Sequence, residues 1–188
     1  MRRALLDAAL QALADGNDIS LRGVARRAGV SHAAPYRHFA DKEALLAAVA
    51  EEGFAAFGQC LQAAKESKED PLQALQAAGV AYVQYAIQHP TRYRVMFGQN
   101  LYSCDQYPSL VAASGATFEI LVSIIQAGQA QGQIKADDTR QLALAAWAQV
   151  HGLAMLLLDG QLPISDPKAI EAMTQQMIQS SIEGLIVR

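Results

Sequence analysis

Two stretches of the chain decide the fold: residues 20–31, which read SLRGVARRAGVS, and residues 36–46, which read YRHFADKEALL. A short helix is expected between Ser20, a residue type that caps helix N-termini, and Gly29, a residue type that ends helices. Ser31 can cap the next helix, which we expect to continue through Phe39. Two short helices joined by a tight turn are typical of a helix-turn-helix, whose second helix enters the major groove of DNA.

Helical apolar spacing continues on both sides of these stretches, and no segment alternates apolar and polar residues as a half-buried strand would. The chain is therefore predicted to be all-α, with about nine helices. The first helix is expected over residues 5–13, ended at Gly16, and the fourth from Asp41 through residue 61. The remaining helices are expected at about residues 72–88, 91–97, 109–131, 137–158 and 167–187.

Composition and cysteine usage narrow the class of protein. The chain has 188 residues, 52% of them hydrophobic, and is long enough to bury roughly 70% of its unfolded surface without a disulfide or a metal. Cys60 and Cys104 lie far apart and form no Cys-x-x-Cys pair, which excludes a disulfide framework and a thiolate zinc site. We therefore expect a reduced, cytoplasmic protein with no metal and no cofactor.

Neither a signal peptide nor a membrane span is expected. Asp7 interrupts the first apolar run well before the ~7–15 residues of a signal-peptide core. Residues 142–158 contain Gln149 and His151 and fall short of the ~20 apolar residues that cross a bilayer. This segment is predicted to be a buried helix of a protein without a membrane partner.

Charge is concentrated unevenly along the chain. Residues 1–45 carry seven basic and five acidic side chains, whereas the formal charge of the whole chain is −3. Residues 19–42 contain five basic side chains and one acidic side chain, Asp41. Such a surface can meet a polyanion although the whole molecule is acidic. The alternative, a helical face that is merely solvated, stays open on charge alone.

The two quoted stretches resemble the DNA-binding domain of TetR-type transcriptional regulators. The resemblance rests on Ala-Gly-Val-Ser at residues 28–31, on Tyr-x-His-Phe at residues 36–39 and on Lys42 three residues later. It implies a DNA-binding domain at residues 1–48 and an effector-binding and dimerisation domain at residues 49–188. It also implies a homodimeric repressor that binds a palindromic double-stranded DNA operator and is released by a small-molecule effector.

The residues of the second stretch can be assigned candidate roles at DNA. Arg37 can read guanine through two hydrogen bonds, and Ala33 and Ala34 can meet thymine methyl groups. Tyr36 matches a family position that holds a phosphate, and its ring is expected to lie partly in the core with the hydroxyl outside. The full candidate set is Arg22, Ser31, His32, Ala33, Ala34, Tyr36, Arg37, His38 and Lys42.

Two residues depart from the family pattern, and others are expected in the core. Gly23 stands where an acidic residue is usual, and Pro35 falls inside the expected recognition helix, where it removes one N–H group. His32 and His38, six positions apart, do not have metal-ligand spacing. The expected core residues of this domain are Leu21, Val24, Val30 and Phe39.

A second resemblance lies further along the chain, where Trp147, His151 and Gly152 match the Trp-x-x-x-His-Gly (WHG) signature of one subclass of TetR-type C-terminal domains. Trp147 and His151 are one helical turn apart, so their rings share a face that can border an effector cavity. Tyr, Phe and Met side chains suit a pocket for an uncharged or aromatic effector, and core packing is the open alternative. The candidate set is Tyr85, Tyr93, Met96, Phe97, Tyr102, Phe118, Trp147, His151 and Met155.

A dimer interface is predicted from the last two helices. The segment at residues 137–158 has two apolar stripes and should be buried on two sides, so we expect it to pair with the final helix and their symmetry mates. The family dimerises in this way. The candidate set is Ala146, Val150, Leu153, Leu157, Met173, Met177, Ile178 and Ile182.

Two other function classes were weighed against a DNA-binding regulator. One is a helical adaptor whose front domain binds protein. The other is an enzyme that uses a C-terminal cavity, for which the sequence offers no nucleophile–base pair, no phosphate loop and no metal-ligand spacing. The sequence therefore favours a regulator that is not an enzyme.

Overall fold

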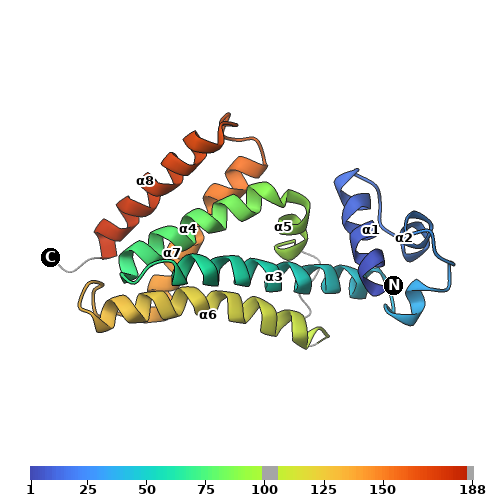
Figure 1. Cartoon of the computed structure of the whole chain (residues 1–188), viewed down its shortest axis with the longest axis horizontal. Helices are drawn as coiled ribbons and strands as arrows, with labels where there is room; N and C mark the ends of the chain where they lie inside the picture. The colour runs from blue at the N-terminus through green and yellow to red at the C-terminus, as the bar shows by residue number, and fades with distance from the viewer. Residues whose placement is uncertain (99–105, 186–188) are drawn as a thin grey trace. The chain divides into compact units, whose positions relative to one another are not determined.

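A computed structural model describes residues 1–98 and 106–185, and these residues contain helices and no strands. The all-α fold class is confirmed (Figure 1). The elements in chain order are α1 (Arg2–Ala14), α2 (Leu21–Arg27), η1 (Pro35–Arg37), α3 (Lys42–Glu66), α4 (Pro71–Gln88), α5 (Pro90–Met96), α6 (Pro108–Ala130), α7 (Thr139–Leu158) and α8 (Pro167–Leu185), where η1 is a single 3₁₀ turn.

The chain forms two compact units that do not follow chain order. The first unit is Met1–Ala55 with His89–Ser114, and the second is Ala56–Gln88 with Gly115–Arg188. Helices α3 and α6 each contribute residues to both units. The division at residues 48 and 49 concerns DNA binding and effector binding, and it stays a prediction.

An apolar core shared by α1, α2 and the first part of α3 holds the first unit together. Leu5 of α1, Val24 of α2 and Leu45 of α3 are each at most 1% exposed, and Phe39 joins the same cluster from the loop before α3. Burial of one such side chain stabilises the fold by roughly 1.5–3 kcal/mol. Leu21, Val24 and Phe39 are core residues as predicted, and Val30 packs partly buried against the cluster.

The ends of the first helices follow their local sequence signals. The Ser20 hydroxyl accepts a hydrogen bond from the Gly23 backbone N–H at 3.1 Å, and the Asp41 carboxylate accepts one from the Ala44 N–H at 2.7 Å. Gly16 and Gly29 adopt left-handed φ angles of 71° and 68° just after α1 and α2. The predicted caps at Ser20 and Asp41 are therefore confirmed, because each satisfies an N–H group that the helix itself leaves without a partner.

The helix expected from Ser31 to Phe39 is wrong. Residues 31–38 instead form turns and the 3₁₀ turn η1, closed by hydrogen bonds from the Ala34 N–H to the Ser31 carbonyl and from the His38 N–H to the Pro35 carbonyl. Pro35 has no N–H to continue an α-helical ladder, and its ring is buried. The cap at Ser31 is wrong too, since its hydroxyl makes no hydrogen bond to the part of the chain that the structure describes.

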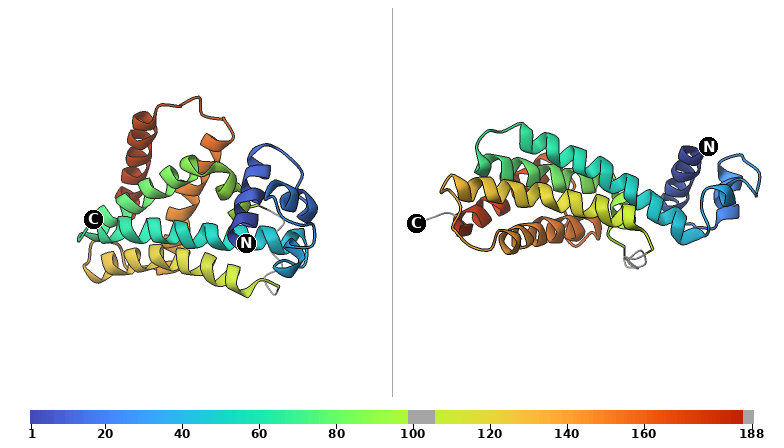
Figure 2. Two further views of the ribbon diagram at one scale, coloured as in Figure 1. Left: turned by 45° about the vertical axis from the view of Figure 1, so that its right-hand side comes forward. Right: turned by 90° about the horizontal axis from the view of Figure 1, so that it is seen from below.

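In the second unit α4 packs against both α7 and α8, and α7 packs against α8, as Figure 2 shows from two further sides. Gly79 of α4 allows the close approach. A Cβ at this position would lie 2.4 Å from Ile178 Cδ1 of α8 and 3.4 Å from Val150 Cγ1 of α7. Within this one chain α7 is not buried on two sides, because Leu144 and Leu156 are 49% and 46% exposed.

Three helices, α3, α6 and α7, are long and apolar enough to cross a membrane by length and composition alone. The prediction that residues 142–158 fall short of a span is therefore wrong on that criterion, because one Gln and one His do not make the helix polar. In the structure the apolar side chains of α3 serve packing, with Phe54, Phe57 and Leu61 each at most 5% exposed.

Replacing Ser20 with Ala should lower the free energy of unfolding by about 1 kcal/mol, because the Gly23 N–H loses its acceptor at the start of α2. The matched variant Ser31→Ala should change it by only a few tenths of a kcal/mol, since that hydroxyl caps nothing in the structure. Urea unfolding followed by circular dichroism measures both. An equal loss in the two variants would contradict the cap assignment.

Candidate nucleic-acid interface and effector pocket

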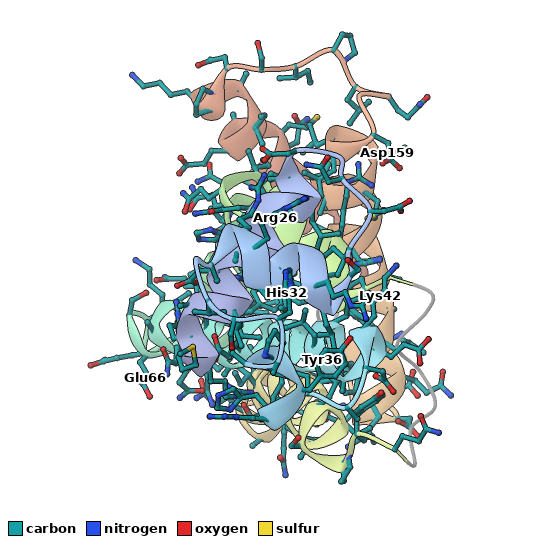
Figure 3. All side chains as sticks on the ribbon, turned by 90° about the vertical axis from the view of Figure 1, so that its right-hand side faces the viewer. Arg26, His32, Tyr36, Lys42, Glu66 and Asp159 are labelled. Atoms are coloured by element: carbon teal, nitrogen blue, oxygen red, sulfur yellow. The ribbon has the colours of Figure 1, made fainter. Side chains whose placement is uncertain are left out.

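The turn between Ser31 and His38 presents its side chains to solvent. Of the nine residues predicted to contact DNA, eight are exposed and Ala34 is half-buried. In Figure 3 the labelled His32, Tyr36 and Lys42 lie on the face of the first unit that is turned toward the viewer. Tyr36 is 54% exposed, so its predicted place partly in the core is wrong. Pro35 is the buried residue of the turn, and Tyr36, which follows it, is exposed to solvent.

The basic residues of α2 have different surroundings. Arg22 and Arg26 are exposed, whereas Arg27 donates a hydrogen bond to the Asp15 carboxylate at 2.5 Å. Arg27 therefore ties the end of α2 to the end of α1. Lys42 is the first residue of α3 and is exposed directly after the loop that contains Phe39.

Tyr93, Met96 and Phe97, three of the predicted effector residues, belong to the core of the first unit. Tyr93 is fully buried and Met96 is 1% exposed. The Phe97 ring packs on Tyr93 with centroids 4.7 Å apart and on Phe54 with centroids 5.3 Å apart. In this structure these three side chains serve packing between α3 and α5.

In the second unit Trp147 and His151 come together as predicted, and Tyr82 joins them. The Trp147 Nε1–H donates to the Tyr82 hydroxyl at 3.0 Å, and this hydroxyl lies 3.0 Å from His151 Nδ1. The two rings on α7 have centroids 5.9 Å apart. Tyr82 was missed in the sequence, although a tyrosine inside an apolar helix usually requires a polar partner for its hydroxyl.

His151, at one end of this hydrogen-bonded chain, is half-buried. Burial lowers the pKa of His151 below its ordinary value of 6.5. In the neutral tautomer that carries its proton on Nε2, Nδ1 accepts from the Tyr82 hydroxyl, which itself accepts from Trp147. The aromatic ring of Phe57 packs edge-on against Tyr82, with centroids 4.9 Å apart.

A surface hollow of about 300 Å³ opens beside Trp147 on α6 and α7. The Arg140 guanidinium lies 5.4 Å from the Phe118 ring centroid and pairs with the Glu119 carboxylate at 2.7 Å. Phe118 and Trp147 have ring centroids 5.8 Å apart. The residues that line the hollow are Phe118, Asp138, Arg140, Gln141, Leu144 and Trp147.

The other predicted effector residues do not line this hollow. Tyr85 is 6% exposed and packs against Phe57, and Met155 is half-buried on α7. Tyr102 lies outside the described residues. A second hollow of about 400 Å³ in the first unit was not predicted, and its lining residues are Leu13, Ala14, Pro90, Thr91, Arg94 and Val95.

Four of the eight residues predicted at a dimer interface are already buried within one chain. They are Val150, Leu153, Ile178 and Ile182. The reason is that α4 covers this side of α7 and α8 at Gly79. The other four, Ala146, Leu157, Met173 and Met177, are half-buried. On α7 and α8, the faces that point away from α4 are the ones that this packing leaves open.

Two family models match this chain. The model described as "Bacterial regulatory proteins, tetR family" matches residues 5–49. The model described as "Tetracyclin repressor-like, C-terminal domain" matches residues 75–180, which is more than half of the chain. The chain belongs to the TetR family. The segment at residues 20–39, predicted as a helix-turn-helix and observed as α2 followed by turns and η1, therefore lies in the N-terminal domain of a DNA-binding regulator.

Relatives of this TetR-family chain include a curated protein and several solved structures. The HTH-type transcriptional repressor NicS of Pseudomonas putida is 31% identical over 105 residues, covering 54% of this chain and 50% of NicS. The chain thus spans about half the length of the curated relative that it matches. A protein of unknown function from Rhodococcus sp. RHA1 has 34% identity and a TM-score of 0.86, covering 99% of this chain and 95% of its own.

A second solved structure, a bacterial regulatory protein in the tetR family from Rhodococcus RHA1, is 21% identical with a TM-score of 0.79. It covers 100% of this chain and 97% of its own, and at this identity it shows the fold alone. Since regulators of this family share the fold, the three apolar helices do not indicate a membrane protein. Within residues 1–98 and 106–185, no three His, Cys, Asp or Glu side chains gather as metal ligands.

Replacing Tyr82 with Phe should lower the free energy of unfolding by about 1–3 kcal/mol, because Trp147 and His151 both lose the hydroxyl between them. Tyr36→Phe is the matched control, since the Tyr36 ring is exposed, and it should leave the free energy unchanged within about 0.5 kcal/mol. Chemical unfolding measures both. A Tyr82→Phe variant as stable as the wild type would contradict a structural role for the hydroxyl.

The lowered pKa of His151 predicts that the protein loses stability in mild acid. Between the lowered pKa and 6.5 the unfolded chain binds more protons than the folded chain, so the free energy of unfolding falls as the pH falls through this range. His151→Gln should flatten this part of the stability profile, and pH-dependent chemical unfolding measures it. Parallel profiles for the wild type and His151→Gln would rule out this linkage.

Proposed function

We propose that this TetR-family regulator is a homodimeric repressor that binds a palindromic operator and is released by a small-molecule effector. The observation that carries the proposal is the exposed turn at residues 31–38. The residues at both ends of this turn pack against the apolar core of the first unit, and its basic and hydrogen-bonding side chains are exposed to solvent. Exposed groups of this kind suit the major groove and its phosphates, whereas a protein-binding adaptor would be expected to expose an apolar patch.

Within this turn we assign base reading and phosphate binding to different residues. Arg37 carries the two parallel donors that guanine accepts, and the Ala33 methyl group suits a thymine methyl. Tyr36, His38 and Lys42 are placed at phosphates, which fix the register of the protein on DNA without reading sequence. Arg22, Ser31, His32 and Ala34 complete the proposed contact surface.

The proposed dimer uses the faces of α7 and α8 that α4 leaves open. Leu156 is 46% exposed, and a Cβ built on Gly152 or Gly184 would meet nothing within 4 Å. Half-buried Met173 and Met177 lie on α8. Exposed apolar side chains beside glycines suit a close pairing of helices about a two-fold axis. We call the exposed turn at residues 31–38 the recognition turn. In such a dimer the two recognition turns would enter successive major grooves, ~34–36 Å apart.

The proposed effector site is the hollow beside Phe118 and Trp147, in a domain that we place in the WHG subclass. Three of its six lining side chains, Phe118, Leu144 and Trp147, are apolar or aromatic and favour an uncharged or aromatic small molecule in the cytoplasm. The polar side chains of the lining offer hydrogen-bond partners for such a molecule. Trp147 is the single tryptophan of the chain, so its fluorescence can report binding directly.

Duplex DNA from the intergenic region beside the gene for this protein should form a salt-sensitive complex that survives competitor DNA. Arg37→Ala should lose about 1–3 kcal/mol of preference for that DNA over competitor, because one bidentate base contact is removed. Its binding to competitor should change little. Lys168→Ala, an exposed cation on α8, serves as the control and should bind as the wild type does.

Gel-shift titration at physiological salt measures these affinities. Absence of any preference for nearby intergenic DNA in the wild type would count against the proposed repressor. An Arg37→Ala variant that keeps the full preference for intergenic DNA over competitor DNA would favour the alternative of a protein-binding adaptor.

A further inference from the structure

Two arginines at the start of α1 share a single carboxylate of α3. The Arg2 Nη1 donates to Glu52 Oε1 at 2.9 Å, and the Arg3 Nη1 donates to Glu52 Oε2 at 3.1 Å. Arg3 also lies 3.2 Å from the Asp7 carboxylate. The Arg2 and Arg3 side chains are 45% and 67% exposed, against 29% for Glu52. Both guanidinium groups therefore remain accessible from solvent.

Arg2 contacts the residue that directly follows the recognition turn, which is the exposed turn at residues 31–38. The Arg2 Cζ lies 5.9 Å from the centroid of the Phe39 ring, which is buried in the core of the first unit. Phe39 directly follows His38, and their ring centroids are 6.2 Å apart. Arg2 and the proposed phosphate ligand His38 therefore both contact the Phe39 ring, Arg2 through a cation–π contact.

The chemistry of this cluster matches a phosphodiester. Two cations in the first turn of a helix oppose the helix dipole, so the arrangement gains little from α1 itself. A guanidinium binds carboxylate and phosphate oxygens in the same forked geometry. Glu52 offers its two oxygens to two guanidiniums, as a bridging phosphate would. The donors that these arginines would offer to a phosphate are thus the ones that Glu52 engages in the free chain.

We propose that Arg2 and Arg3 form a second DNA-backbone site beside the recognition turn, and that Glu52 limits its strength by competing with phosphates for the two guanidinium groups. The inference rests on the DNA-binding role proposed above. It concerns the electrostatic part of binding, which does not depend on base sequence. It can therefore be tested on mixed-sequence DNA, before any operator is known.

The first test measures the salt dependence of binding to a fluorescent mixed-sequence duplex of about 30 base pairs, long enough for two successive major grooves. The double variant Arg2→Gln with Arg3→Gln should lower the slope of log affinity against log salt by about 1.8 per chain, or about 0.9 for each lost phosphate contact. The matched control is Lys68→Gln with Lys168→Gln, two exposed cations of the second unit. It removes the same charge and should leave the slope unchanged.

The second test separates competition from a purely structural ion pair. Glu52→Gln should tighten binding to the same duplex by roughly threefold to tenfold, whereas Glu69→Gln, exposed and of equal charge change, should alter it little. An ion pair that only anchors α1 would give weaker or unchanged binding in Glu52→Gln, and that result overturns the proposal.

Thermal unfolding of each variant checks the fold. If the double variant unfolds, the single variant Arg3→Gln should lower the slope by about 0.9, and an unchanged slope contradicts the inference. Failure of the wild type to bind any duplex would overturn the proposed function itself. Wild-type binding with an unchanged slope in the arginine variants would overturn this inference alone.

Discussion

The exposed turn between Ser31 and His38 depends on apolar contacts at its two ends. Ala28 and Val30 pack against the core of the first unit before the turn, and Phe39 enters the same core after it. Pro35 is buried in the middle and interrupts the backbone hydrogen bonding of a regular helix. Since these contacts fix the backbone, the remaining side chains of the turn must face solvent. The surface that can meet DNA is therefore a consequence of how a small apolar core is closed.

Much of this fold could be predicted from the sequence, because helix positions and ends have local causes. Apolar spacing located the helices, and Ser20, Asp41, Gly16 and Gly29 marked their ends. The turn could not be predicted in the same way, because the missing N–H of Pro35 is visible in the sequence whereas the burial of its ring is a tertiary contact. Periodicity also shows which face of a helix is apolar, but not which helix covers it. The close approach of Gly79 to Ile178 and Val150 joins residues far apart in the chain, and it buries two of the predicted dimer residues within one chain.

The second unit places a short polar chain among aromatic rings. Trp147, Tyr82 and His151 satisfy one another's polar groups, and Phe57 packs against the central hydroxyl-bearing ring. Trp147 contacts Phe118 beside the open hollow, so one side chain belongs to both the hydrogen-bonded chain and the hollow's wall. A molecule that enters the hollow would therefore contact Trp147, whose hydrogen bond to Tyr82 joins α7 to α4. Of the predicted effector residues, Phe118 and Trp147 line this hollow, and Tyr82, which the sequence did not predict, is hydrogen-bonded to Trp147.

The most direct measurement of the central claim is amide hydrogen exchange of the full chain with and without duplex DNA. On binding DNA, exchange should slow in residues 31–42, where backbone N–H groups and exposed side chains meet the duplex, while buried residues of α4 and α8 keep their rates. Unchanged exchange in residues 31–42, together with slowed exchange elsewhere on the surface, would contradict DNA binding through this turn. Such a result would show that DNA binds a different face.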